Sequence, residues 1–157
     1  MGFDVHRLVK GRPLVLGGVR LAFPKGLLGH SDSDAILHAL CDALLGAVGE
    51  GDIGVHFPDS DPQWKDASSK IFVKKASQLV AQRGWGIVNV DLTVLAQAPK
   101  IGPHRKAIQQ SVAKILKVPS ERVNLKAKSM QGIGPIGAQE AIGAYAAVLL
   151  EAKKRKR

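Results

Sequence analysis

The chain has 157 residues, which is enough for one domain with a substantial core, and 45% of them are hydrophobic, as is usual for globular proteins. No apolar run approaches the roughly 20 residues that would cross a bilayer, so no membrane partner is expected. The formal net charge of +10 is uneven, because residues 1–66 hold nine acids and six bases whereas residues 67–157 hold four acids and seventeen bases.

The predicted elements begin with an extended segment over residues 2–6, in which alternate side chains share a face. A hairpin with a glycine turn follows over residues 14–21. Ser and Asp capping residues predict a helix from about residue 33 to residue 48, followed by a glycine-rich loop over residues 49–54. The Pro and Asp content of residues 57–62 indicates a turn.

The second half of the chain alternates in the same way, with a predicted helix over residues 69–82, a strand over 88–94, a helix over 104–116, a strand over 123–129 and a flexible loop over 132–137. Residues 141–150 suit either a helix or a tightly buried strand. No repeat or linker interrupts this order, so the sequence predicts one α/β (α+β) domain over residues 1–150 and a basic tail over residues 151–157.

Three residues form a candidate metal site. Asp4 and His6 leave an extended strand on the same face, so both can bind one ion, and His38 on the first predicted helix is the third candidate. Two imidazoles and one carboxylate suit zinc and leave a fourth position open for a substrate oxygen. Asp34 and Asp42 lie one helical turn from His38, and either could accept the second N–H of its ring. The alternative for His38 is a packed, hydrogen-bonded histidine without a metal.

The single cysteine, Cys41, excludes an intramolecular disulfide and lies among apolar helix residues, which indicates a buried thiol in a reducing compartment. The first residues lack the basic segment and apolar run of a signal peptide. The positive charge of residues 67–157 would attract an anionic partner, either a polyanion such as nucleic acid or a diphosphate. Aromatic residues make up only 4% of the chain, and no RNA-binding aromatic motif is present, so nucleic acid is not the expected partner.

Five blocks, in order and with matching spacing, resemble the 2-C-methyl-D-erythritol 2,4-cyclodiphosphate synthase family from Gly2 to about Leu150. They are Gly2-Phe3-Asp4-Val5-His6, Leu28-Gly29-His30-Ser31-Asp32-Ser33-Asp34 with His38-Ala39-Leu40, Gly51-Asp52-Ile53-Gly54, Phe57-Pro58-Asp59-Ser60-Asp61-Pro62 and Ala96-Gln97-Ala98-Pro99-Lys100. The resemblance implies a mixed β-sheet packed on one side by helices. It also implies a homotrimer with active sites between neighbouring subunits.

The activity implied by the resemblance is conversion of 4-diphosphocytidyl-2-C-methyl-D-erythritol 2-phosphate into 2-C-methyl-D-erythritol 2,4-cyclodiphosphate, with release of CMP, in the non-mevalonate isoprenoid pathway. The partner is then a small cytidyl diphosphate substrate, in the cytoplasm of a bacterium or in a plastid. Zn²⁺ and a second ion, Mg²⁺ or Mn²⁺, are the implied cofactors. The substrate's own 2-phosphate attacks phosphorus, so the protein supplies no nucleophile.

The resemblance also implies roles for individual residues. Asp4, His6 and His38 would bind zinc. The catalytic positions would be His30, Lys128 and Ser129, and the substrate-binding positions would be Ser31, Asp52, Gly54, Phe57, Asp59, Ala96, Pro99, Lys100 and Ala127. Of these, residues 96–100 and 127–129 would come from the neighbouring subunit. A loop histidine that caps the next helix is the alternative for His30, and an exposed loop lysine is the alternative for Lys100.

Three positions depart from the family pattern. Gln131 stands where the family has a glutamate that helps to bind the second metal, and a neutral amide oxygen predicts weaker binding of a hard cation there. Pro135 and Ala138 replace a phenylalanine and an arginine. In relatives that arginine lines a cavity on the trimer axis, so the anion site of that cavity is expected to be absent or altered. The alternative function is a catalytically weakened homologue that binds cytidine nucleotides as a trimer.

Overall fold

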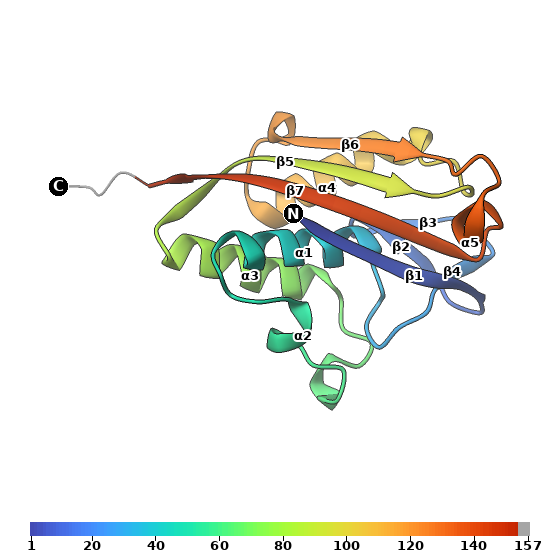
Figure 1. Cartoon of the computed structure of the whole chain (residues 1–157), viewed down its shortest axis with the longest axis horizontal. Coiled ribbons are helices and arrows are strands. Elements are labelled where there is room, and N and C mark those ends of the chain that lie inside the picture. Colours follow the sequence, from blue (N-terminus) through green and yellow to red (C-terminus); the bar gives the residue numbers. More distant parts are fainter. Residues whose placement is uncertain (154–157) are drawn as a thin grey trace.

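A mixed five-stranded sheet organises the structure, a computed structural model that describes residues 1–153 (Figure 1). The strand order is β4-β1-β7-β5-β6, with bounds Gly2–Lys10 for β1, Lys25–Leu27 for β4, Trp85–Leu95 for β5, Val123–Lys128 for β6 and Ala141–Ala152 for β7. β5 and β6 run parallel, and the other neighbouring strands are antiparallel. The expected mixed sheet is therefore confirmed.

The long helices cover one face of this sheet. They are α1 (Ala35–Ala47), α3 (Lys70–Gln82) and α4 (Arg105–Leu116). Shorter helical turns are α2 (Ile53–His56), α5 (Gly134–Gly137) and the 3-10 segments Pro62–Trp64, Gly102–His104 and Ser120–Arg122. Along β1 the side chains alternate between the helix-covered face and the free face, where Phe3 and Val5 are exposed. The three predicted long helices are confirmed.

Two predictions about the end of the chain are resolved. Residues 141–150 form a strand, because β7 lies between β1 and β5 and buries alternate side chains such as Ile142 and Ala144. The loop predicted over residues 132–137 is wrong in part. Pro135, which is well suited to the first turn of a helix, lies in the single turn α5.

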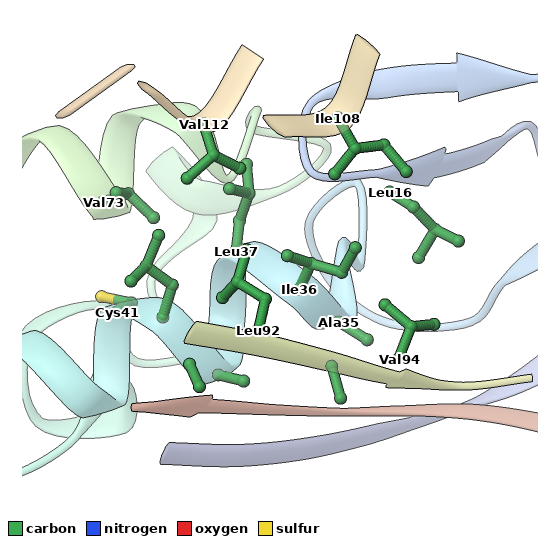
Figure 2. Close-up of a cluster of buried hydrophobic side chains, with 14 of the residues drawn as sticks. Leu16, Ala35, Ile36, Leu37, Cys41, Val73, Leu92, Val94, Ile108 and Val112 are labelled. Atoms are coloured by element: carbon green, nitrogen blue, oxygen red, sulfur yellow. The ribbon is translucent and has the colours of Figure 1, made fainter. Parts of the chain in front are cut away.

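The core is centred on α1, which is buried on most of its circumference. Figure 2 shows Ile36 and Leu37 of α1 between Leu92 of β5 and the α4 residues Ile108 and Val112. The predicted burial of the Cys41 thiol, on the same helix, is confirmed, and burial raises its pKa well above the usual value. A helix that is apolar nearly all round needs partners on several sides, which explains why the sheet and α3 both contact it.

The predicted hairpin is confirmed and is attached to α1 by a buried carboxylate. β2 (Leu14–Leu16) and β3 (Val19–Leu21) are joined by Gly17 and Gly18, whose φ angles are 59° and 77°. The backbone N–H groups of Gly17 and Gly18 donate to the Asp34 carboxylate at 2.8 and 2.6 Å. The same carboxylate accepts from Leu37 N–H at 3.1 Å and so caps the start of α1.

A close approach of β1 to α1 brings the candidate metal ligands together. A Cβ atom built on Gly2 would lie 2.0 Å from the carbonyl oxygen of Ala39, so no side chain fits at this position. The absence of a side chain at Gly2 therefore lets the start of β1 lie directly against α1. Asp4 and His6 consequently face His38.

The basic tail expected over residues 151–157 stays a prediction. β7 continues through Ala152, and residues 154–157 lie outside the described part of the chain. Within residues 1–153, none of the helices combines the length and the apolar character that crossing a bilayer requires.

Candidate metal centre and substrate cavities

Asp4, His6 and His38 converge on one point. Asp4 Oδ2 lies 2.7 Å from His6 Nε2 and 3.0 Å from His38 Nδ1, and the two ring nitrogens are 3.0 Å apart. A tetrahedral zinc ion with bonds of about 2 Å holds its donors roughly 3.3 Å apart. The three donor atoms therefore need to separate by only a few tenths of an ångström to bind one ion. This geometry fits the predicted metal site.

The hydrogen bonds on the far side of each ring fit a metal as well. Nδ1 of His6 lies 2.9 Å from the carbonyl oxygen of Leu28, which can only accept, so Nδ1 carries the proton. Nε2 of His38 lies 2.8 Å from the hydroxyl of Ser69, and that hydroxyl donates its own proton to Asp32. Ser69 therefore accepts from Nε2 of His38. In the neutral form of each ring, the other nitrogen is then unprotonated and directed at the site, as a metal ligand requires.

The predicted role of Asp34 and Asp42 beside His38 is wrong. Asp34 accepts from the hairpin and from the start of α1, and Asp42 accepts from Ile53 N–H at 2.8 Å. The partners of His38 are instead the hydroxyls of Ser69 and Ser31, the latter at 3.1 Å. Helical spacing correctly places both carboxylates near His38 along the chain, but the far nitrogen of the ring is directed toward the start of α3.

The sequence does not reveal the role of Ser69 beside His38, nor that of Asp32 beside Ser69. Ser69 is fully buried just before α3 and donates to Asp32 from both its backbone N–H and its hydroxyl. The separation of 31 residues between His38 and Ser69 leaves no local pattern that links them. A serine directly before a predicted helix reads as a cap, yet this side chain makes no capping hydrogen bond.

The ion pairing within the triad favours an ionised carboxylate. Burial raises the pKa of Asp4, but hydrogen bonds with His38 and His6 and the charges of both rings outweigh burial, so this pKa lies well below its usual value. Burial lowers the pKa of His6, but its hydrogen bond and charge interaction with Asp4 outweigh burial and raise it. Asp4 is therefore an anionic donor over the whole physiological range.

A cavity of about 380 Å³ opens over the triad. Five of the predicted site residues line it together with the triad, namely His30, Ser31, Gly54, Phe57 and Asp59. Nε2 of His30 is buried and has no hydrogen-bond partner among residues 1–153. The predicted substrate-binding residue Asp52 does not line this cavity, because its carboxylate caps α2 by accepting from Val55 N–H at 3.1 Å.

The remaining predicted residues gather elsewhere. A separate cavity of about 470 Å³ is lined by Ala96, Pro99, Lys100, Ala127, Lys128 and Ser129, together with five neighbouring residues. None of its lining residues also lines the metal cavity. Gln131 lines neither cavity, and its side-chain amide donates to the Ser129 hydroxyl at 3.1 Å. One chain therefore presents the predicted site as two separate halves.

Comparisons with known proteins agree with this arrangement. The chain is 52% identical over 150 residues to the 2-C-methyl-D-erythritol 2,4-cyclodiphosphate synthase of Syntrophomonas wolfei, covering 96% of each protein. A solved 2C-methyl-D-erythritol-2,4-cyclodiphosphate synthase in a CDP-bound form superposes with a TM-score of 0.88 at 44% identity, covering 96% of this chain and 97% of that one.

A second solved structure is longer than this chain. The bifunctional IspDF of Campylobacter jejuni superposes with a TM-score of 0.92 at 40% identity, and the match covers 96% of this chain but 41% of the bifunctional protein. The profile of the YgbB family matches residues 1–151, which include the triad and both cavities. This chain therefore belongs to the YgbB family.

Proposed function

We propose that this chain is a zinc-dependent 2-C-methyl-D-erythritol 2,4-cyclodiphosphate synthase. It would convert 4-diphosphocytidyl-2-C-methyl-D-erythritol 2-phosphate into the 2,4-cyclodiphosphate and release CMP. The observation that carries the proposal is the Asp4–His6–His38 triad, whose donor atoms meet at the floor of a cavity. Curated relatives about half identical to this chain carry the name of this enzyme. The proposed compartment is the cytoplasm.

In the proposed reaction an oxygen of the 2-phosphate forms a bond to the β-phosphorus. The bond from that phosphorus to the bridging oxygen breaks, and CMP leaves with this oxygen and its electron pair. Zinc, when bound, withdraws electron density from the β-phosphate. His30 and Ser31 hold the phosphates, and Asp59 accepts hydrogen bonds from the hydroxyls of methylerythritol. The unpartnered Nε2 of His30 supports its role, because a buried polar nitrogen without a protein partner is available to a phosphate oxygen.

The cytidyl end of the substrate is assigned to the second cavity, with Lys100 and Lys128 at the diphosphate. Backbone groups of Pro99 and Ala127 would read a base edge. The ribose is assigned to Asp52 and to Gly54, which lines the metal cavity of the other subunit. The name of the solved relative in its CDP-bound form supports a cytidyl ligand. The two cavities share no residues on one chain, which supports a complete site built from two subunits.

The free face of the sheet supports assembly as a homotrimer. Phe3 and Tyr145 lie side by side there with ring centroids 4.6 Å apart, and Val5 and Leu149 are about half exposed on the same face. Neighbouring exposed apolar side chains on a paired sheet mark a surface that another subunit covers. In the proposed closed trimer, the second cavity of one subunit would lie beside the triad of the next.

The second ion is proposed to be Mg²⁺ or Mn²⁺, bound mainly through the substrate phosphates. Gln131 provides no charge, and its amide is engaged with Ser129. This observation favours one alternative function, a trimer that binds cytidine nucleotides but turns over the substrate poorly.

The deciding experiment is CMP release with zinc present and Mg²⁺ or Mn²⁺ titrated, for wild type and for Gln131→Glu. Turnover by wild type that is lost on zinc removal supports the synthase. Turnover restored by Gln131→Glu alone places the defect at the second ion. Absence of turnover in both proteins, with CDP still bound, identifies the nucleotide-binding alternative.

A further inference from the structure

A third cavity lies apart from both halves of the proposed site. Its volume is about 450 Å³, and it lies between α3, the end of α4 and the start of β5. In Figure 1 these segments meet at the end of the molecule where β7 also ends. None of its lining residues lines the metal cavity or the cytidyl cavity. The reaction proposed above leaves this cavity without a role.

The inner wall of this cavity is apolar. Val80 of α3 and Ile115 and Leu116 of α4 contribute the buried part of the lining. Ile87 and the indole of Trp85 continue the apolar surface outward, and Trp85 is 40% exposed. An apolar group placed here would lose contact with water, which is favourable by about 25 cal/mol for each Å² buried.

The rim of this cavity carries only positive charge. Lys74 on α3, Lys117 after α4 and Lys153 after β7 are exposed, and no carboxylate is among the lining residues. In the sequence, Lys153 begins a run of five basic residues. Three ammonium groups from three separate segments around one opening attract an anion.

We propose that this cavity binds a small amphipathic anion, with an apolar chain or ring against the inner wall and a phosphate or carboxylate at the lysine rim. The volume falls within the roughly 300–1,000 Å³ typical of small-molecule sites. A polyanion is a poorer match, because its charges continue along its whole length and would leave the apolar wall uncovered. The cavity lies on the helix-covered side of the sheet, between α3, α4 and β5, so assembly through the free face would leave it open. The proposal does not depend on the function proposed above.

Octyl phosphate, kept below its micelle concentration, is a suitable probe for the full chain. Calorimetry should show one molecule bound per subunit. The variant Trp64→Phe keeps Trp85 and removes the other of the two tryptophans. A change in the fluorescence emission of Trp85 during titration then locates the probe at this cavity. Octanol and inorganic phosphate should each bind about tenfold more weakly or worse, because each retains only half of the interaction.

Charge variants complete the test. The double variant Lys74→Gln with Lys117→Gln should weaken binding of octyl phosphate about tenfold. The matched control, Lys106→Gln with Lys114→Gln, removes two exposed charges of α4 outside the cavity and should change affinity less than about twofold. An unchanged Trp85 emission would overturn the proposal. Equal losses of affinity in the two double variants would also overturn it, as would unchanged affinity in Lys74→Gln with Lys117→Gln.

Discussion

At the scale of single residues, the candidate metal centre depends on groups that are not themselves ligands. Ser69 accepts from Nε2 of His38 and donates to Asp32, and the carbonyl of Leu28 accepts from Nδ1 of His6. These bonds set the tautomer of both rings. The identity of the ligands therefore explains only part of the affinity for the ion.

Replacing Ser69 with alanine removes the nearer of the two hydroxyl groups at His38 Nε2 and leaves only Ser31, at 3.1 Å. We expect the zinc affinity to fall about 10- to 100-fold, because the ring loses its fixed tautomer and orientation. Competition with a chromogenic chelator measures this change. Ser69→Thr keeps the hydroxyl and should retain most of the affinity. Equal affinity in Ser69→Ala and wild type would contradict this role for Ser69.

Asp34 should make stability depend on pH. Burial raises its pKa to about 6, although three backbone N–H donors limit the rise. The folded state then holds a proton that the unfolded chain releases near pH 4, so this contribution to stability falls as pH rises from about 4 to about 6, by roughly 3 kcal/mol. Urea unfolding at several pH values should show that, between about pH 4 and pH 6, the free energy of unfolding of wild type falls by roughly 3 kcal/mol relative to that of Asp34→Asn. A constant difference between the two proteins would refute the assignment.

At the scale of elements, the contact of β1 with α1 places the triad. The carbonyl of Ala39 occupies the space where a side chain at position 2 would begin. Moving β1 outward by the width of a methyl group would carry Asp4 and His6 away from His38. Strand position and metal binding are therefore coupled through this one contact.

Gly2→Ala tests that coupling. The added methyl forces β1 away from α1, and we expect a loss of about 2 kcal/mol or more in stability, together with weaker zinc binding. Thermal unfolding with and without zinc measures both effects. The control is Gly46→Ala on α1, where an added Cβ meets nothing within 4 Å. Helix propensity predicts that this control gains up to about 1 kcal/mol. Zinc binding that is unaltered in Gly2→Ala would argue against the coupling.

Much of the element order could be predicted from sequence, because caps and periodicity act locally. The start of α1 at its Ser and Asp residues and the alternation within β5 are examples. Residues 141–150 could not be assigned, because the exposed positions of β7, such as Tyr145 and Leu149, are apolar like its buried positions, so polar and apolar residues do not alternate along it. The triad could be predicted because Asp4 and His6 are neighbours on one strand. Ser69 could not, because only the packing of α3 beside α1 brings it to His38.

At the scale of the whole molecule, the two separate cavities predict complementation between inactive subunits. Asp4→Asn disables the metal half and Lys100→Ala the cytidyl half. If each complete site combines one half from each of two neighbours, random mixed trimers regain about a quarter of the sites. Unfolding and refolding the two variants together, followed by a CMP release assay, measures this recovery. Activity no greater than that of the separate variants would show that each site lies within one chain.

The separation of the two cavities also bears on how dilute subunits would behave. If the site is shared between subunits as proposed, a molecule that spans both halves contacts two chains at once, and its binding free energy adds to that of assembly. At low protein concentration the substrate would then draw subunits together, and its removal would release them. Enzyme activity would therefore rise more than proportionally with protein concentration until assembly is complete.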